Sequence, residues 1–225
     1  MDFWYNFGKS VAWSYIQLFV HDIHVEGREN LVRGPKIIVA NHALATDAFV
    51  LPFVFPDRLN FMVQAEMFRL PILGKILAWA DQIPVVRGKG QEALAAAKER
   101  LLKGNAVVIF PEGRLNDGNE FHRAFTGATR LTLESGAPVV PVGFYTPPKF
   151  ARAMSSQLFG RQTHGAWQFG GETFLKIGEA WRPAIEASAE NSYLALREMT
   201  DDLMGRIRIQ VDQAKAFASG IFSKR

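Results

Sequence analysis

KIIVANHALATD (residues 36–47) and AVVIFPEGR (residues 106–114) share one layout, a short apolar run followed directly by polar residues. An apolar run of this length is typical of a strand that is buried on both faces of a parallel sheet. The polar residues then emerge at the carboxyl ends of the strands, and open α/β sheets bind ligands at that edge. The two stretches therefore predict the fold class and the place of the functional site together.

The rest of the chain alternates in the same way between strand-like and helix-like patterns. We expect strands at 22–26, 37–40, 60–64, 83–86, 107–110, 139–144 and 173–177, and helices at 46–54, 71–80, 91–103, 126–135 and 192–218. Proline at a helix start and glycine after a helix end support several of these bounds. This alternation predicts an α/β fold with a mostly parallel twisted sheet flanked by helices.

Length and composition favour one domain. The chain has 225 residues, of which 48% are hydrophobic and 21% charged, so it can bury a sizeable core. We expect a single domain over 1–225, without repeats or an interdomain linker. Its parts are an N-terminal helix (1–20), a core that bears the motifs (21–146), a loop or lid (147–170) and a C-terminal strand and helix (171–225).

Composition also limits the chemistry and the partners. The chain has no cysteine, which excludes disulfides and thiol catalysis. We expect a cytoplasmic location, because no apolar segment has the flanks of a secretory signal. The net charge of +4 and the pI near 9.4 favour an anionic partner, such as an anionic lipid headgroup or a phosphorylated substrate. The basic residues are dispersed and match no recognised nucleic-acid-binding motif, so we expect no nucleic acid.

The N-terminal segment predicts an amphipathic helix with a broad aromatic face. Polar residues recur every three or four positions between Asn6 and His21, and aromatic or aliphatic residues fill the rest. The uncharged run from Ser10 to Val20 has eleven residues, whereas spanning a bilayer takes about 20. Two interpretations remain, a helix that lies in the membrane interface and a helix that packs on the core. The Trp and Tyr content favours the interface.

Residues 147–170 break the alternation. The segment combines two prolines and scattered glycines with basic and aromatic side chains, namely Lys149, Arg152, Arg161, His164, Phe150, Phe159, Trp167 and Phe169. We expect a loop or lid here. It could meet the membrane or an acyl donor, or it could be a surface excursion with a few core anchors.

His42 and Asp47 are the candidate catalytic pair. On one continuous helix they would lie about 140° apart around the axis. They can meet only if a turn carries His42 into a helix that starts near Thr46 or Asp47. The carboxylate would then hold one ring nitrogen, and the other could take a proton from a hydroxyl. This is the base and orienter of a hydrolytic triad without a protein nucleophile, so the nucleophile should belong to the substrate.

The second motif supplies a candidate anion site. Arg114 has the fork-like donors that suit phosphate, and Gly113 lets the backbone approach a ligand closely. Glu112 has two possible roles, binding a substrate hydroxyl or holding Arg114 in place. Arg87 follows another predicted strand and is a second candidate for phosphate, although an arginine at such a place is usually a solvated surface residue.

Four blocks together resemble the glycerolipid acyltransferases, a family that includes the 1-acylglycerol-3-phosphate acyltransferases. The blocks are Asn41-His42 to Asp47, Ile83 to Gly88, Phe110-Pro111-Glu112-Gly113-Arg114 and Ala137 to Gly143. Asn41, Pro111, Pro141 and Gly143 are motif positions that we expect to be structural. Two departures concern the acceptor. Leu44 stands where phosphatidate-forming members often have Ser, and Gly113-Arg114-Leu115-Asn116 stands where the family usually has Gly-Thr-Arg-Ser.

The resemblance implies transfer of a fatty acyl group to a hydroxyl of a lysophospholipid or glycerol phosphate, most simply 1-acylglycerol-3-phosphate. The donor would be acyl-CoA or acyl carrier protein, with no metal or other cofactor. His42 would deprotonate the acceptor, and Asp47 would fix its tautomer. Backbone amides near Asp47 or beside Pro141, Val142 and Gly143 are candidate oxyanion donors. The implied location is peripheral, on the cytoplasmic face of an anionic membrane.

Three other interpretations remain open. His42 could activate water in a lysophospholipid or thioester hydrolase. The chain could also be a lipid-binding or membrane-tethering protein without catalysis, although the intact motifs argue against that. Finally, His21, Asp22, His24 and Glu26 resemble a metal-ligand cluster, but alternation along a strand puts His21 on the opposite face from the others. We therefore expect solvated strand residues there.

Overall fold

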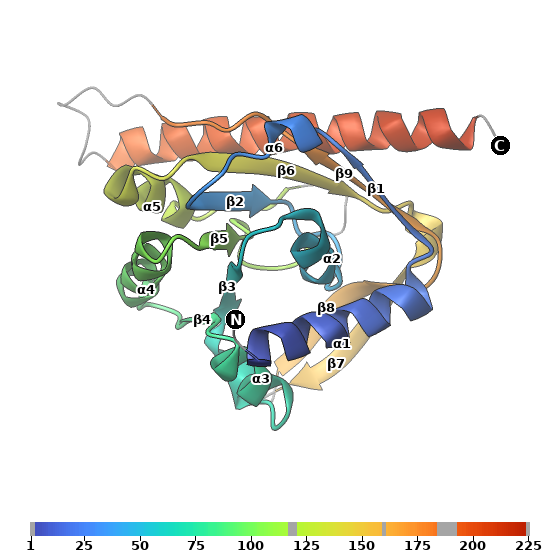
Figure 1. The fold of residues 1–225 in the computed structure, drawn as a ribbon, viewed down its shortest axis with the longest axis horizontal. Helices are drawn as coiled ribbons and strands as arrows, with labels where there is room; N and C mark the ends of the chain where they lie inside the picture. The colour runs from blue at the N-terminus through green and yellow to red at the C-terminus, as the bar shows by residue number, and fades with distance from the viewer. Residues whose placement is uncertain (1–2, 117–120, 159–160, 184–192, 224–225) are drawn as a thin grey trace.

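The computed structural model describes residues 3–116, 121–158, 161–183 and 193–223 (Figure 1). In this part of the chain, seven strands form one sheet in the order β1-β9-β6-β2-β5-β3-β4. These are β1 (Asp22–Glu26), β2 (Lys36–Ala40), β3 (Leu59–Gln64), β4 (Ile83–Val85), β5 (Ala106–Ile109), β6 (Val139–Tyr145) and β9 (Glu172–Ile177). The strands β6, β2, β5, β3 and β4 run parallel, β9 is antiparallel to β6, and β1 is parallel to β9. The predicted mostly parallel α/β sheet is confirmed.

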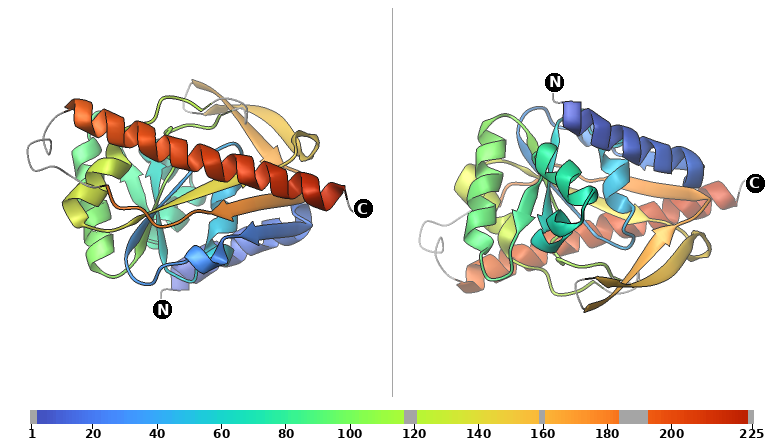
Figure 2. Two further views of the ribbon diagram at one scale, coloured as in Figure 1. Left: turned by 90° about the horizontal axis from the view of Figure 1, so that it is seen from above. Right: turned by 90° about the horizontal axis from the view of Figure 1, so that it is seen from below.

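Helices cover both faces of the sheet, and the strand period explains how. The helices are α1 (Phe3–Phe19), α2 (Asp47–Val54), α3 (Leu73–Trp79), α4 (Gly90–Leu102), α5 (Gly127–Ser135) and α6 (Tyr193–Phe222), with short 3-10 turns η1 (Arg28–Asn30), η2 (Ala65–Arg69) and η3 (Pro148–Phe150). In β2, Ile37 and Val39 pack in the core with α4, α5 and α6, whereas Ile38 and Ala40 pack with α1 and α2. Figure 2 shows α6 across one face and α1 across the other.

Most predicted bounds agree with the structure to within two residues. The exception is α6, which continues to Phe222 instead of ending at 218. Within it, Leu203, Ile207 and Val211 are buried at the four-residue spacing of a helix that packs on a sheet. A long outer helix with mixed charges is what the sequence predicted, and its inner stripe is what holds it to β6 and β9.

The predicted N-terminal helix is α1, and it packs on the core along one side. Ala12 and Ile16 are buried, and the Tyr5 hydroxyl accepts a 3.0 Å hydrogen bond from the Leu59 backbone N–H. The opposite side leaves apolar side chains in solvent, including Leu18, which is 72% exposed. Core packing is therefore part of the role of α1, while its exposed side is free for another contact.

The segment 147–170 is not a loop, so the expectation of a loop was wrong, while a role as a lid stays a prediction. The segment forms an antiparallel hairpin of β7 (Ala151–Leu158) and β8 (Arg161–Gln168), outside the main sheet. Arg152, Ala153 and Met154 of β7 are exposed. The hairpin thus lacks the apolar run by which buried strands are recognised in a sequence. Phe159 and the side chains of Arg161 and His164, which the predicted lid included, lie outside the described residues.

Within the described residues, hydrogen bonds from Ala45 and Tyr15 attach this hairpin to the rest of the molecule. The Ala45 N–H donates to the Ala166 carbonyl at 2.9 Å, and the Tyr15 hydroxyl of α1 donates to the Gln168 carbonyl. Ala45 lies in the loop between His42 and Asp47. The hairpin therefore connects α1 with the loop that bears the candidate catalytic pair.

Gly143 is the point where α6 crosses β6. A β-carbon added to Gly143 would lie 2.2 Å from the carbonyl carbon of Gln210 and 2.3 Å from the backbone nitrogen of Val211. Both atoms belong to the α6 backbone, which cannot move aside as a side chain would. The absence of a side chain at Gly143 sets how closely the helix approaches the strand.

We therefore expect Gly143→Ala to lower the free energy of unfolding by about 1–3 kcal/mol, because the added methyl group forces strand and helix apart. Gly205→Ala on the same helix is the matched control, since nothing lies within 4 Å of its added β-carbon. That change should raise the free energy by about 0.5–1 kcal/mol through helix propensity. Denaturant unfolding measures both, and equal midpoints for Gly143→Ala and the parent chain would contradict the packing argument.

Candidate active site

The loop after β2 brings His42 and Asp47 together as the spacing required. Thr46 is the N-cap of α2 and Asp47 its first residue, so the chain turns between the two side chains. The Nδ1 atom of His42 lies 3.4 Å from Oδ2 of Asp47. The predicted turn into a helix near residue 46 or 47 is confirmed. With Nδ1–H directed to the carboxylate, Nε2 is left without that proton and can accept one.

Asp47 is buried and held by the backbone of its own loop. Its side chain is 3% exposed, and Oδ2 accepts a 2.8 Å hydrogen bond from the Leu44 N–H. Burial raises the pKa of Asp47, while the hydrogen bond to His42 acts in the opposite direction. Since the folded protein disfavours the charged form, ionised Asp47 lowers stability as the pH rises through its raised pKa. The loop thus keeps a destabilising carboxylate within 3.4 Å of the His42 ring.

Phe110 fixes the other side of the His42 ring. The two rings are stacked with centroids 4.0 Å apart and an interplanar angle of 16°. Val39 is the partner of Ile109 in the parallel pairing of β2 with β5, so Phe110 follows next to the end of β2. The imidazole is held by a carboxylate at its edge and by an aromatic ring on its face, with 19% of the side chain exposed to an incoming substrate.

Glu112 organises the loop after β5. It is 2% exposed, its Oε1 accepts a 2.7 Å hydrogen bond from the Asn116 side chain, and its Oε2 accepts a 2.8 Å bond from the His122 N–H. The Asn116 backbone N–H in turn donates to the His42 carbonyl at 2.8 Å. The contacts of Glu112 are therefore neither with Arg114 nor with open solvent, and through Asn116 it positions the peptide of His42.

Gly113 and Pro111 shape the same loop. Gly113 has φ +65°, and an added β-carbon would lie 2.8 Å from Cε2 of Phe125, so a side chain would be strained there. The Gly113 carbonyl accepts a 2.9 Å bond from the Gln64 side chain at the end of β3, and the Pro111 carbonyl accepts one from the Phe125 N–H. These contacts attach the loop to the end of β3 on one side and to the segment around Phe125 on the other.

Arg114 and Arg87 are exposed at the same edge of the sheet as His42. Within the described residues neither guanidinium has a hydrogen bond or ion pair, and both side chains are exposed to solvent, where an anion can reach them. β5 is next to β2, which puts Arg114 one strand away from His42. Arg87 follows β4, three strands away, or about 14 Å at ordinary strand spacing. The sheet order therefore favours Arg114 over Arg87 as the cation nearest the base.

The other motif residues make contacts within the fold. The side-chain amide of Asn41 makes two hydrogen bonds with the Phe144 backbone, at 3.1 Å and 2.7 Å, which fixes the end of β2 against β6. Pro141 and Gly143 are buried in β6, where Gly143 lets α6 pack. Because this part of β6 is covered by α6, we discard it as the oxyanion site. The amides at the start of α2 remain as candidates.

Sequence reasoning missed Phe110 and Asn116 as residues that hold His42. In the sequence, Phe110 has the apolar character of a strand end, and Asn116 stands out only as a departure from the family pattern. The pairing of β2 with β5, which the sequence does not reveal, is what brings both residues beside His42.

A cavity lined by Val32, Arg33 and Ala137 lies at the opposite edge of the sheet and is not part of this site.

Comparison with known proteins identifies acyltransferases as relatives of this chain. A 1-acyl-sn-glycerol-3-phosphate acyltransferase of Saccharomyces cerevisiae is 32% identical over 127 residues, covering 54% of this chain and 42% of the relative. A lyso-ornithine lipid O-acyltransferase of Pseudomonas aeruginosa is 34% identical over 113 residues, covering 49% and 43%. The chain thus spans about half the length of the curated relatives that it matches.

The fold is also shared with a solved structure. The crystal structure of the 1-acyl-sn-glycerophosphate acyltransferase PlsC from Thermotoga maritima aligns with a TM-score of 0.66 and 25% identity, covering 94% of this chain and 80% of that one. A family model described as Acyltransferase matches residues 22–145, which include both motif loops. Since this match spans more than half of the chain and contains His42, Asp47 and the loop that holds them, the protein belongs to the acyltransferase family.

Proposed function

We propose that the protein transfers a fatty acyl group from acyl-CoA or acyl carrier protein to the free hydroxyl of 1-acylglycerol-3-phosphate, giving phosphatidate. The observation that carries the proposal is the His42–Asp47 pair, held by Phe110 and Asn116, in a chain of the acyltransferase family. The names of its relatives in Saccharomyces cerevisiae and Thermotoga maritima support this acceptor. Exposed Arg114, in the loop that follows the strand adjacent to β2, suits an acceptor that carries phosphate.

The mechanism uses both nitrogens of the His42 imidazole. Nε2 of His42 takes the proton of the acceptor hydroxyl while Asp47 stabilises the imidazolium that forms. The oxygen attacks the thioester carbonyl, and the tetrahedral intermediate collapses with loss of the thiolate. His42 can then return the proton to the sulfur. Amides at the start of α2 are the candidate donors to the oxyanion.

A second acceptor class is supported by the relative of Pseudomonas aeruginosa that is named as a lyso-ornithine lipid O-acyltransferase and is 34% identical. The catalytic pair would work in the same way on that hydroxyl. The contribution of Arg114 separates the two acceptors, because its proposed partner is the phosphate. A hydrolase that uses water in place of an acceptor remains the third outcome of an acceptor panel.

We also propose that the protein works at the cytoplasmic face of a membrane with anionic lipids. No helix among the described residues is long and apolar enough to cross a bilayer. The exposed apolar side chains that support surface binding lie on α1 and α3, and we call them the α1/α3 surface: Phe3, Phe7, Val11, Leu18, Ile72, Leu73 and Trp79. The two helices are in contact, with the rings of Trp4 and Trp79 4.0 Å apart. α1 also packs on α2, whose first residue is Asp47.

An acceptor panel with the His42→Ala variant tests the proposed reaction. The purified protein is offered 1-acylglycerol-3-phosphate, lyso-ornithine lipid or no acceptor, with both donors, and products are measured by mass spectrometry. We expect phosphatidate to form, and we expect its rate to fall about 10²- to 10⁴-fold in His42→Ala, because the general base is lost. Asp47→Asn should lose comparable activity without loss of stability, since it removes a buried charge. Full activity of folded His42→Ala would refute the mechanism.

Arg114→Ala should raise KM for 1-acylglycerol-3-phosphate about 10- to 150-fold, because a charge-assisted contact of about 1.5–3 kcal/mol is lost. KM for the acyl donor should change little. Arg87→Ala should have the smaller effect, because β4 is further from His42. Lys103→Ala, an exposed cation at the end of α4, controls for net charge. Equal losses with an acceptor that lacks phosphate would make Arg114 structural.

The membrane proposal is tested by substitution, because deletion of residues 1–19 would also remove buried Ala12 and Ile16. The combined change Phe3→Ser and Leu18→Ser should weaken binding to anionic vesicles about tenfold or more, since two exposed apolar side chains lose their burial in lipid. The control is Leu102→Ser on α4, because Leu102 is 80% exposed and lies outside the α1/α3 surface. Turnover of a short-chain soluble acceptor should be unchanged. Unaltered vesicle binding would exclude the α1/α3 surface.

A further inference from the structure

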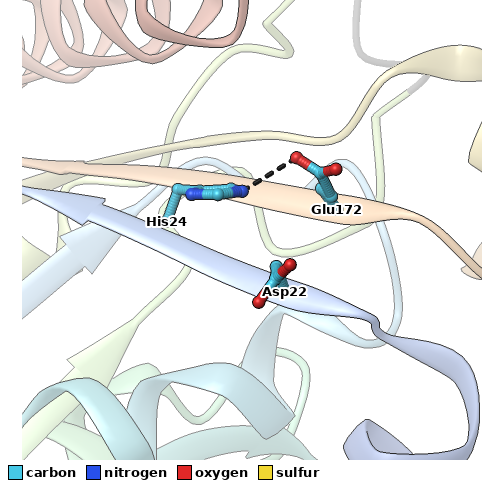
Figure 3. A group of neighbouring side chains, drawn as sticks. All are labelled: Asp22, His24 and Glu172. Carbon is cyan, nitrogen blue, oxygen red and sulfur yellow. Dashed lines mark hydrogen bonds and ion pairs between the residues drawn. The ribbon is translucent and has the colours of Figure 1, made fainter. Parts of the chain in front are cut away.

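Strand pairing completes a cluster of three ligand-type side chains at the β1–β9 edge of the sheet. Asp22 and His24 come from β1, and Glu172 comes from the start of β9, directly opposite Asp22 in the register. The ligand atoms of all three lie within 4.8 Å of one another, and Nε2 of His24 is 2.8 Å from Oε2 of Glu172. Figure 3 shows the three side chains together on neighbouring strands, with His24 directed to Glu172. Glu172 is distant in sequence, so the pattern of 21–26 alone could not reveal this group.

We propose that Asp22, His24 and Glu172 bind a divalent transition-metal ion of the Zn²⁺ class. One imidazole nitrogen and two carboxylate oxygens are a ligand set that Zn²⁺ accepts, with water in the remaining position. Two carboxylates and a neutral imidazole carry a charge of −2, which the ion would balance. The Asp22 carboxylate has no protein partner within the described residues, whereas an ion pair between His24 and Glu172 would account for only two of the three groups.

The His24 ring is already oriented for this role. It stacks on Phe174 with centroids 4.7 Å apart and an interplanar angle of 13°, and the edge of Phe217 from α6 closes another side. Glu172 is 7% exposed, so two of the three ligands are fixed by packing. Ligand atoms around tetrahedral Zn²⁺ lie about 3.3 Å apart at ordinary bond lengths. Exposed Asp22 is the side chain that can rotate to close the remaining gap.

The cluster is separate from the catalytic pair because the sheet lies between them. Ile23 and Val25 of β1 pack in the core on the α1 and α2 side, so Asp22 and His24 face the α6 side. Phe110, which stacks on His42, packs on the α1 and α2 side. An ion at the cluster would not reach His42.

The bound ion would join two chain junctions. β1 begins where α1 ends, and β9 begins where the β7–β8 hairpin ends. The His21 N–H already donates to the Gly171 carbonyl at 2.8 Å, and the Gly170 N–H donates to the Phe19 carbonyl at 2.7 Å. Metal binding between Asp22 and Glu172 would strengthen this attachment of α1 and the hairpin to the sheet. The inferred role is structural.

Isothermal titration of the full chain with ZnCl₂ tests the proposal. We expect one equivalent of Zn²⁺ to bind with micromolar affinity and to raise Tm by several degrees. Asp22→Asn and His24→Ala should each weaken binding by at least tenfold. Asp22→Asn cannot fail for lack of folding, because its side chain is exposed and has no described protein partner. Co²⁺ in place of Zn²⁺ should give a visible absorption spectrum that the same variants lose.

Two control variants locate the ion. His21→Ala removes a neighbouring imidazole from the opposite face, and Glu26→Gln removes a carboxylate of β1 that is paired with Lys176 at 3.5 Å. Both should bind Zn²⁺ like the parent chain. Binding should also weaken as the pH falls, because protons compete with the ion for the ligand atoms. Absence of binding, or equal affinity in Asp22→Asn, His24→Ala and the parent chain, would overturn the proposal.

Discussion

The parallel pairing of β2 with β5 is the constraint on which the site depends. Its register sets Val39 beside Ile109, and the loops that follow leave the sheet side by side. From that pairing come the stacking of Phe110 on His42 and the hydrogen bond from the Asn116 N–H to the His42 carbonyl. Both strands are fully buried, so a slip by one residue would turn the apolar side chains of each from one helix layer to the other. The hydrophobic core thus fixes the geometry of the polar site.

Two buried carboxylates at this edge are held in different ways. Both oxygens of Glu112 accept hydrogen bonds from its own loop, so this carboxylate stabilises the loop conformation. Asp47 has backbone contacts and His42, yet burial still raises its pKa, which means that its charge lowers stability at neutral pH. If His42 takes up a proton, the negative charge of Asp47 already lies beside the imidazolium that forms. Burial thus makes the charge of Asp47 unfavourable beside His42, while the two hydrogen bonds of Glu112 hold the surrounding loop.

The helix α1 connects the exposed apolar surface with the site. Its inner side packs on the core through Ala12 and Ile16, and the Tyr15 hydroxyl bonds to Gln168 of the β7–β8 hairpin. The hairpin in turn contacts the loop between His42 and Asp47 through the hydrogen bond from the Ala45 N–H to the Ala166 carbonyl. The rings of Tyr15 and Phe49 lie 5.4 Å apart, which links α1 to α2 directly. Lipid bound on the outer side of α1 would therefore be linked to the loop between His42 and Asp47 by two steps, from α1 to the hairpin and from the hairpin to the loop.

The sequence by itself determined the sheet-forming runs, the helices between them and the candidate pair His42 and Asp47, because these depend on local periodicity and on a turn of a few residues. It also predicted the two motif loops at one edge of the sheet. Tertiary structure decided what depends on strand order and register: the role of Glu112 beside Asn116, the stacking of Phe110, and the meeting of Glu172 with Asp22 and His24. The hairpin at 151–168 was missed for a related reason, since its strands outside the main sheet carry no buried apolar run. Patterns along a chain report burial, whereas contacts between distant residues follow from which strands pair.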